Sequence, residues 1–134
     1  MQTVFEPRIT LPFDGDAFDR MKEIARQILQ NARDNRYTEA IVLLSGKGTE
    51  YSTVIRDAVH GDRKEEEELL RRLEQKNDGE VSRILCMWKD GGVDIPSFYL
   101  RERLIALHPQ NGTAGMFVQT KNGFALIPLS ITMK

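Results

Sequence analysis

The sequence predicts an α/β fold in which a mixed sheet carries helices on both faces. Segments with apolar residues at helical spacing alternate along the chain with short runs of branched apolar residues, in the order helix, strand, strand, helix, strand, helix, strand, strand. Strands and helices that interleave in this way pack as layers around one sheet. The length of 134 residues is typical of one domain, so we expect a single domain over residues 1–134.

The first half of the chain predicts one helix and a strand pair. Residues 1–13 are expected to be irregular or extended because two prolines interrupt them. Residues 16–35 place apolar side chains at helical spacing between charged ones, which predicts an amphipathic helix. Residues 40–44 are short, apolar and branched, and a Ser-Gly-Lys-Gly turn over 45–48 follows them. We therefore expect a buried strand there, with residues 51–56 returning as the second arm of a hairpin.

The second half predicts two helices and three strands. Residues 62–75 carry a leucine stripe and end at Asn-Asp-Gly, as a helix does, and residues 81–88 predict a strand. A third helix is expected to start at Pro96-Ser97, since proline favours the first turn of a helix. Residues 114–120 and 124–133 flank an Asn-Gly pair, the strongest short signal for a hairpin.

Composition excludes several classes of function. The formal net charge is −1, whereas nucleic-acid and anionic-membrane binders normally carry a basic surplus, so neither partner is expected. The N-terminus has no apolar signal segment, and no apolar run approaches the length that spans a bilayer. We therefore expect a cytoplasmic protein. The single cysteine, Cys86, excludes an internal disulfide and a multi-cysteine metal site.

Several local motifs have an ordinary structural interpretation. Residues 45–49 lack the first glycine of a phosphate loop and lead into a strand, so they predict a turn. The acidic run at 65–68 suits the positive end of a helix dipole. His60 and His108 have no second histidine at ligand spacing, which favours capping or solvated roles. Cys86 lies within an apolar strand, where a buried and inert thiol is expected.

Two segments carry a family resemblance. Lys64-Glu65-Glu66, at the start of the second helix, resembles the Cys- or His-Ala-Glu motif of the cytidine deaminase superfamily. Pro96-Ser97-Phe98-Tyr99-Leu100-Arg101-Glu102 resembles the Pro-Cys-x-x-Cys motif of that superfamily, with its following Arg and Gln or Glu. The order of elements and the Asn122-Gly123 hairpin are similar to the free-nucleoside branch. The resemblance implies a three-layer α-β-α sandwich with a mixed five-stranded sheet and a C-terminal antiparallel hairpin.

The resemblance also shows which chemistry is missing. In the family, three side chains from two helix N-termini hold Zn²⁺, and the glutamate of the first motif moves protons. The equivalent ligand positions here are Lys64, Ser97 and Leu100. Glu66 stands at the glutamate position and is the candidate catalytic residue, but a proton shuttle without metal-activated water lacks a nucleophile. The resemblance therefore implies a degenerate member that lacks the zinc ligands and has no cofactor.

The resulting prediction is a catalytically inactive, zinc-free protein that binds a small polar or nucleoside-like ligand in the former active-site cleft. Lys64 is predicted to take the place of the metal and to pair with Glu66 or Glu65. The segment Ile55-Arg56-Asp57 is the nearest match to the ribose-binding Asn-x-Glu of the family, and keeps only its acid. The candidate ligand-binding residues are Lys64, Glu66, Ser97, Tyr99, Arg101 and Asp57.

Three alternatives remain open from the sequence. The first is an interaction or structural module whose cleft is filled by the large residues 98–100. The second is a zinc-independent enzyme that uses the same polar residues. The third is a deaminase with displaced zinc ligands, for which His60-Gly61-Asp62 is the nearest triplet. The resemblance also implies a homo-oligomer, a dimer or a tetramer, which is a common state for small domains.

Overall fold

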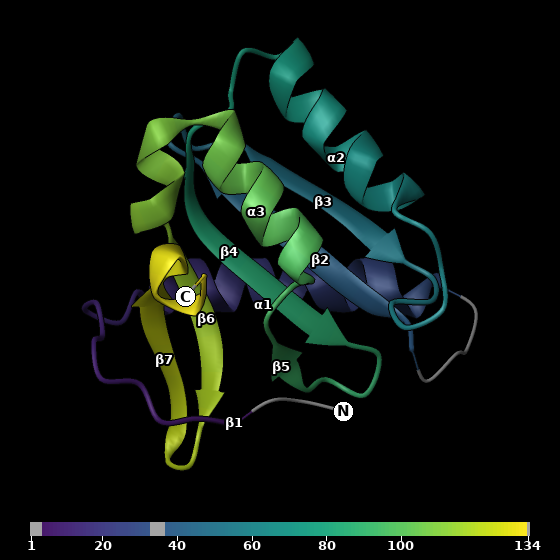
Figure 1. Cartoon of the computed structure of the whole chain (residues 1–134). Coiled ribbons are helices and arrows are strands. Elements are labelled where there is room, and N and C mark those ends of the chain that lie inside the picture. Colours follow the sequence, from purple (N-terminus) through teal and green to yellow (C-terminus); the bar gives the residue numbers. More distant parts are fainter. Residues whose placement is uncertain (1–3, 33–36, 134) are drawn as a thin grey trace.

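A computed structural model describes residues 4–32 and 37–133. In this part of the chain a seven-stranded mixed sheet lies between helix α1 on one face and helices α2 and α3 on the other (Figure 1). The three-layer α/β fold predicted from the sequence is therefore confirmed. The elements are β1 (Val4–Phe5), α1 (Gly15–Gln30), β2 (Glu39–Ser45), β3 (Glu50–Ile55), α2 (Lys64–Gln75), β4 (Val81–Trp88), β5 (Val93–Asp94), α3 (Phe98–Leu107), β6 (Gly115–Thr120) and β7 (Gly123–Pro128), with 3-10 turns over Pro109–Thr113 and Leu129–Thr132.

The five longer strands are those that the sequence predicts. They pair in the order β7, β6, β4, β2 and β3, and β4 and β6 form the only parallel pair among these five. The C-terminal pair is antiparallel, as expected from the Asn-Gly turn. Two further strands of two residues each extend the sheet: β1 pairs with β6 in parallel, and β5 pairs with β4 antiparallel. Both are too short to give a sequence pattern.

The alternation of side chains along β2 divides the core into two layers. Ile41 and Leu43 pack with the leucines of α2 and α3, whereas Ala40 and Val42 pack against the apolar stripe of α1. Successive side chains of a strand point to opposite faces, so one buried run serves both layers. Glu39 is in phase with Ile41. The first residue of β2 therefore points its carboxyl group toward the layer that contains α2 and α3.

Two predicted boundaries differ from the structure. The first helix ends at Gln30 rather than at residue 35, and the Lys89 ammonium donates to the carbonyls of Leu29 and Ala32 at that end; residues 33–36 lie outside the described part. The last strand ends at Pro128 because residues 129–132 turn into a 3-10 helix. No helix within the described ranges has both the length and the apolar character needed to cross a membrane.

Candidate functional site

The N-terminal ends of α2 and α3 meet at one pair of side chains. Ser97 caps α3, and its hydroxyl oxygen accepts the backbone N–H of Leu100 at 3.1 Å. The same hydroxyl donates its proton to Oε2 of Glu66, in the first turn of α2, at 2.5 Å. Glu66 is buried, with 2% of its surface exposed. The structure therefore brings together two helix starts that are 31 residues apart in the chain.

Arg63 provides the second partner of the Glu66 carboxylate. Its Nη1 lies 3.2 Å from Oε1 of Glu66, while half of the Arg63 side chain remains exposed. The Arg63 guanidinium also lies over the ring of Tyr99, 5.4 Å from the ring centre. Both oxygens of Glu66 thus have a protein partner, and a buried carboxylate needs such partners to offset its desolvation.

The expected pairing of Lys64 with Glu66 is wrong in this structure. Lys64 is exposed, and the hydrogen bond at this residue joins its backbone N–H to Asp62. On a helix, residues two positions apart point to different sides, whereas residues three apart are neighbours. Arg63 stands three positions before Glu66 and Lys64 stands two, so the arginine makes the contact.

A small cavity lies beside this pair. Its volume is about 10 Å³, which is roughly the space that one water molecule requires. The cavity lies among the starts of β2, α2 and α3 and the segment that follows β3. The residues that line it are Glu39, Ile55, Asp57, Ala58, Asp62, Arg63, Glu66 and Ser97.

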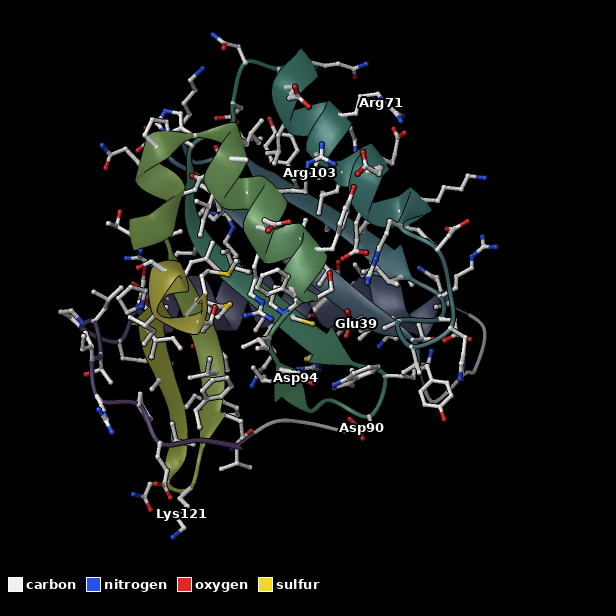
Figure 2. All side chains as sticks on the ribbon, in the orientation of Figure 1. Glu39, Arg71, Asp90, Asp94, Arg103 and Lys121 are labelled. Atoms are coloured by element: carbon white, nitrogen blue, oxygen red, sulfur yellow. The ribbon has the colours of Figure 1, made fainter. Side chains whose placement is uncertain are left out.

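Glu39 is the most deeply perturbed acid of the cavity wall. It is 4% exposed, and the pKa of its carboxyl group is raised from 4.5 to about 7. Burial is the main cause; the hydrogen bond from the Cys86 thiol lowers the pKa, and the nearby Asp94 and Glu66 raise it. Figure 2 shows Glu39 below the starts of α2 and α3, with Asp94 nearby on β5. The carboxyl group of Glu39 therefore changes charge near neutral pH.

Asp57 also lines the cavity, and part of its carboxylate is used by its own loop. Its Oδ1 accepts the backbone N–H groups of Val59 and His60 at 3.1 and 2.8 Å. The pKa of Asp57 is lowered, mainly by the hydrogen bond from the His60 backbone. His60 Nδ1 lies 3.4 Å from Oδ2 of Asp57. These bonds fix the conformation of the segment that follows β3, in which Asp57 lines the cavity.

Of the six predicted ligand-binding residues, three line the cavity: Glu66, Ser97 and Asp57. Lys64, Tyr99 and Arg101 lie outside it. The Tyr99 hydroxyl accepts a hydrogen bond from Arg103 at 2.6 Å. Arg101 is 9% exposed and donates to the carbonyls of Pro96 and Thr132, each at 3.0 Å, and burial lowers its pKa. Tyr99 and Arg101 therefore support α3.

Sequence reasoning missed two important wall residues, Glu39 and Arg63. A signal for Glu39 existed: an acid immediately precedes the buried strand and is in phase with Ile41. Arg63 could have been found from its position three residues before Glu66, but the neighbouring Lys64 offers a similar charge, and the sequence did not fix where the helix begins.

The residues at these two helix starts do not fit a zinc ion. The positions that the resemblance equates with ligands hold Lys64, which is exposed, Ser97, which is bound to Glu66, and Leu100, which is fully buried in the core. Zinc sites in proteins use thiolate, imidazole and carboxylate donors. Across residues 4–32 and 37–133, no three His, Cys, Asp or Glu side chains form a group that could hold a metal ion.

Comparison with known proteins gives a likeness in three dimensions only. No protein-family model matches the chain, and no curated protein is significantly similar to it. Solved cytidine deaminases are similar in structure. That from Mycobacterium leprae has a TM-score of 0.63 at 13% identity, over 87% of this chain and 96% of its own. That from Bacillus anthracis has a TM-score of 0.64 at 15% identity, over 85% of this chain and 84% of its own.

A third solved structure, the cytidine deaminase from Mycobacterium tuberculosis, has a TM-score of 0.61 at 13% identity, over 86% of this chain and 92% of its own. At these identities the likeness establishes the architecture, and function has to be argued from the site. The chain has a cytidine deaminase-like fold, which confirms the fold that the two sequence motifs implied.

Proposed function

We propose that this chain is a zinc-free, catalytically inactive deaminase-like protein that retains a small polar binding site at the starts of α2 and α3. The observation that carries the proposal is the contact between Ser97 and Glu66. The glutamate that would move protons in a deaminase is here tied to a serine at one of the equivalent ligand positions. A second oxygen of the same carboxylate is paired with Arg63.

The donor chemistry supports the absence of zinc-dependent hydrolysis. Deaminases of this fold use the metal to make hydroxide available at neutral pH, which is worth several orders of magnitude in rate. A lysine, a capping serine and a buried leucine supply no comparable Lewis acid. Glu66 alone leaves the reaction without a nucleophile, so its remaining role is to shape the charge of the cavity.

Zinc reconstitution tests this proposal directly. Protein purified without metal is incubated with excess zinc chloride, passed through a desalting column and measured by elemental analysis, and cytidine turnover is followed by the loss of absorbance in the same sample. We expect far less than one zinc per chain and no turnover. One tightly held zinc per chain, or turnover abolished by Glu66→Gln, would overturn the proposal.

A structural module with a filled cleft is the second candidate, and the size of the cavity favours it. A volume of about 10 Å³ holds about one water molecule, so a nucleoside does not fit without rearrangement. Leu100, one of the large residues expected to close the cleft, is fully buried, whereas Phe98 is half-exposed. The burial of Leu100 thus supports a closed cleft, whereas the exposed side chain of Phe98 does not fill it.

A thermal-shift screen separates the two candidates. A ligand that binds the folded chain raises its melting temperature, by an amount that grows with concentration above Kd. The screen contains nucleosides, nucleotides, small anions and small amines at constant ionic strength. A reproducible rise with any of these, absent in a Glu66→Gln variant, supports a retained site, whereas silence throughout supports the module.

A further inference from the structure

The sheet has two long edges, and within the described part of the chain only one of them is covered. β7 forms one edge, and the segment before α1 lies along it, where the Leu11 backbone N–H donates to the Leu126 carbonyl at 2.8 Å. β3 forms the other edge, and no described strand pairs with its outer side (Figure 1). The strand Glu50–Ile55 contains no proline or lysine, residues that commonly protect an open edge from pairing.

The outer side of β3 presents backbone groups at three alternating residues. The hairpin of β2 and β3 closes with a hydrogen bond from the Ser45 N–H to the Thr49 carbonyl, at 2.8 Å. Along an antiparallel strand, residues that bond to the neighbouring strand alternate with residues that do not. Counted from Thr49, the N–H and C=O groups of Glu50, Ser52 and Val54 therefore point away from β2.

Arg72, on α2, shows that this edge lacks an acceptor. Its Nη2 donates to the outward carbonyl of Ser52 at 2.7 Å, whereas its buried Nε has no hydrogen-bond partner among the described residues. Buried polar groups are nearly always satisfied, so this donor needs an acceptor from outside the described chain. A carbonyl has two lone pairs, so Ser52 can accept the N–H of a further strand and keep its bond to Arg72.

We propose that β3 pairs with β3 of a second copy of this chain, antiparallel and across a two-fold axis at Thr53. A two-fold interface brings the same surface of both copies together, so the strand has to be complementary to itself. With Thr53 on the axis, Ser52 of one copy lies opposite Val54 of the other. Both residues have outward backbone groups, so they can exchange N–H···O bonds in both directions.

Charge complementarity selects this register. β3 begins with Glu50, and Arg56 follows its last residue. Each stands three residues from Thr53, so Glu50 of each copy lies opposite Arg56 of the other, once at each end of the strand pair. An axis at Ser52 or Val54 would leave both charges without an opposite. Arg56 is exposed, and its side chain makes no ion pair within the described ranges, so it is available for this contact.

Glu50 can accept a second guanidinium. Arg20 of α1 donates to Oε1 of Glu50 at 3.0 Å and also contacts Oε2. A carboxylate accepts about four hydrogen bonds, so capacity remains for Arg56 of the second copy. Tyr51 and Ile55 pack in the layer of α2 and α3, so Glu50 and Arg56, which alternate with them, are in phase with the α1 face. The two charges thus meet on the same face of the extended sheet.

The expected dimer is weak and dissociates readily. A strand of six residues on each side buries less than the roughly 800 Å² per partner that is typical of a stable complex. Interfaces of that standard size already extend down to micromolar affinity, so we expect a Kd of about 100 µM. The proposal goes beyond the proposed function, because no residue of the cavity beside Glu66 takes part in the charge pairs.

Sedimentation velocity of the full chain, from about 5 to 500 µM, measures this assembly. The parent should sediment as a monomer at the lowest concentration and mostly as a dimer at the highest. Val54→Pro removes one outward N–H and leaves the bonds between β3 and β2 in place, so it should stay monomeric throughout, with an unchanged far-UV circular dichroism spectrum. A parent that is monomeric over the whole range overturns the proposal, and so does a folded Val54→Pro variant that dimerises like the parent.

Two charge reversals test the register. Arg56→Glu and Glu50→Lys each place like charges opposite one another, so each alone should raise the dimer Kd about tenfold. An equimolar mixture of the two variants restores both pairs of opposite charge and should dimerise like the parent. Lys121→Glu reverses an exposed charge at the β6–β7 turn, remote from β3 (Figure 2), and should leave the Kd unchanged. A mixture that associates no better than either variant alone, or a single reversal without effect, overturns the proposed pairing.

Discussion

Glu39 makes the stability of this protein depend on pH in an unusual direction. Most carboxyl groups in folded proteins are stabilised as anions, so stability is lost as the solution becomes acidic. Glu39 is buried at the start of β2, and its pKa is raised from 4.5 to about 7. Between these two values the folded chain binds more protons than the unfolded chain at this residue. Its contribution to folding therefore becomes less favourable as pH rises from 4.5 to 7.

The size of the effect follows from the pKa difference. One pKa unit corresponds to about 1.4 kcal/mol, so a shift from 4.5 to about 7 is worth about 3 kcal/mol once Glu39 is fully ionised. The substitution Glu39→Gln keeps the shape of the side chain and removes the ionisation. The free energy of unfolding of the variant, relative to that of the parent, should therefore increase by about 3 kcal/mol between pH 4.5 and pH 8.

Urea denaturation followed by far-UV circular dichroism, at half-unit steps from pH 4.5 to pH 8.5, measures this difference. We expect the free energies of unfolding of parent and variant to separate progressively up to pH 7 and then to run parallel. Glu102→Gln, at an exposed carboxylate, should follow the parent throughout. A constant gap between parent and Glu39→Gln at every pH would refute the reasoning, because it would mean that Glu39 titrates alike in both states.

Three further substitutions test the contacts that build the site and its support. Ser97→Ala removes the α3 cap and the Glu66 contact and should cost about 1–3 kcal/mol, measured by urea denaturation against Ser130→Ala. Asn111→Ala should cost about 2–4 kcal/mol in the same assay, because its buried amide bonds the backbone of β4, α3 and the loop between α2 and β4. Gly115→Ala should lower the melting temperature by several degrees, since its new Cβ would lie 2.9 Å from Leu126.

Much of the fold could be predicted because its signals are local. Residues 81–88 form a strand with the predicted limits, and the Asn-Gly turn produced the expected antiparallel pair. The two-residue strands β1 and β5 could not be predicted, because they exist only through pairing with β6 and β4. A strand of two residues has no periodicity of its own, so its position is set by tertiary contacts.

The candidate site was less predictable than the fold. The sequence placed Glu66 and Ser97 at the starts of two helices, and the structure joins them. The cation that contacts Glu66 depends on helical phase, and a difference of one residue in the sequence changes that phase. The sequence predicted Lys64 for this contact, whereas the structure has Arg63. The burial of Glu39 depends on what covers the start of β2. The phase of Glu39 with Ile41 gives the direction of its side chain, but the segments that cover it are distant in the chain.

The hydrogen bond from Arg101 to the Thr132 carbonyl joins the 3-10 turn over Leu129–Thr132 to α3. Arg101 also donates a hydrogen bond to the carbonyl of Pro96, the residue before the serine that is hydrogen-bonded to Glu66. Displacing residues 129–132, or removing them, would break the hydrogen bond between Arg101 and Thr132. The start of α3 could then shift. An affinity tag is therefore better attached far from this tail when the cavity is to be studied.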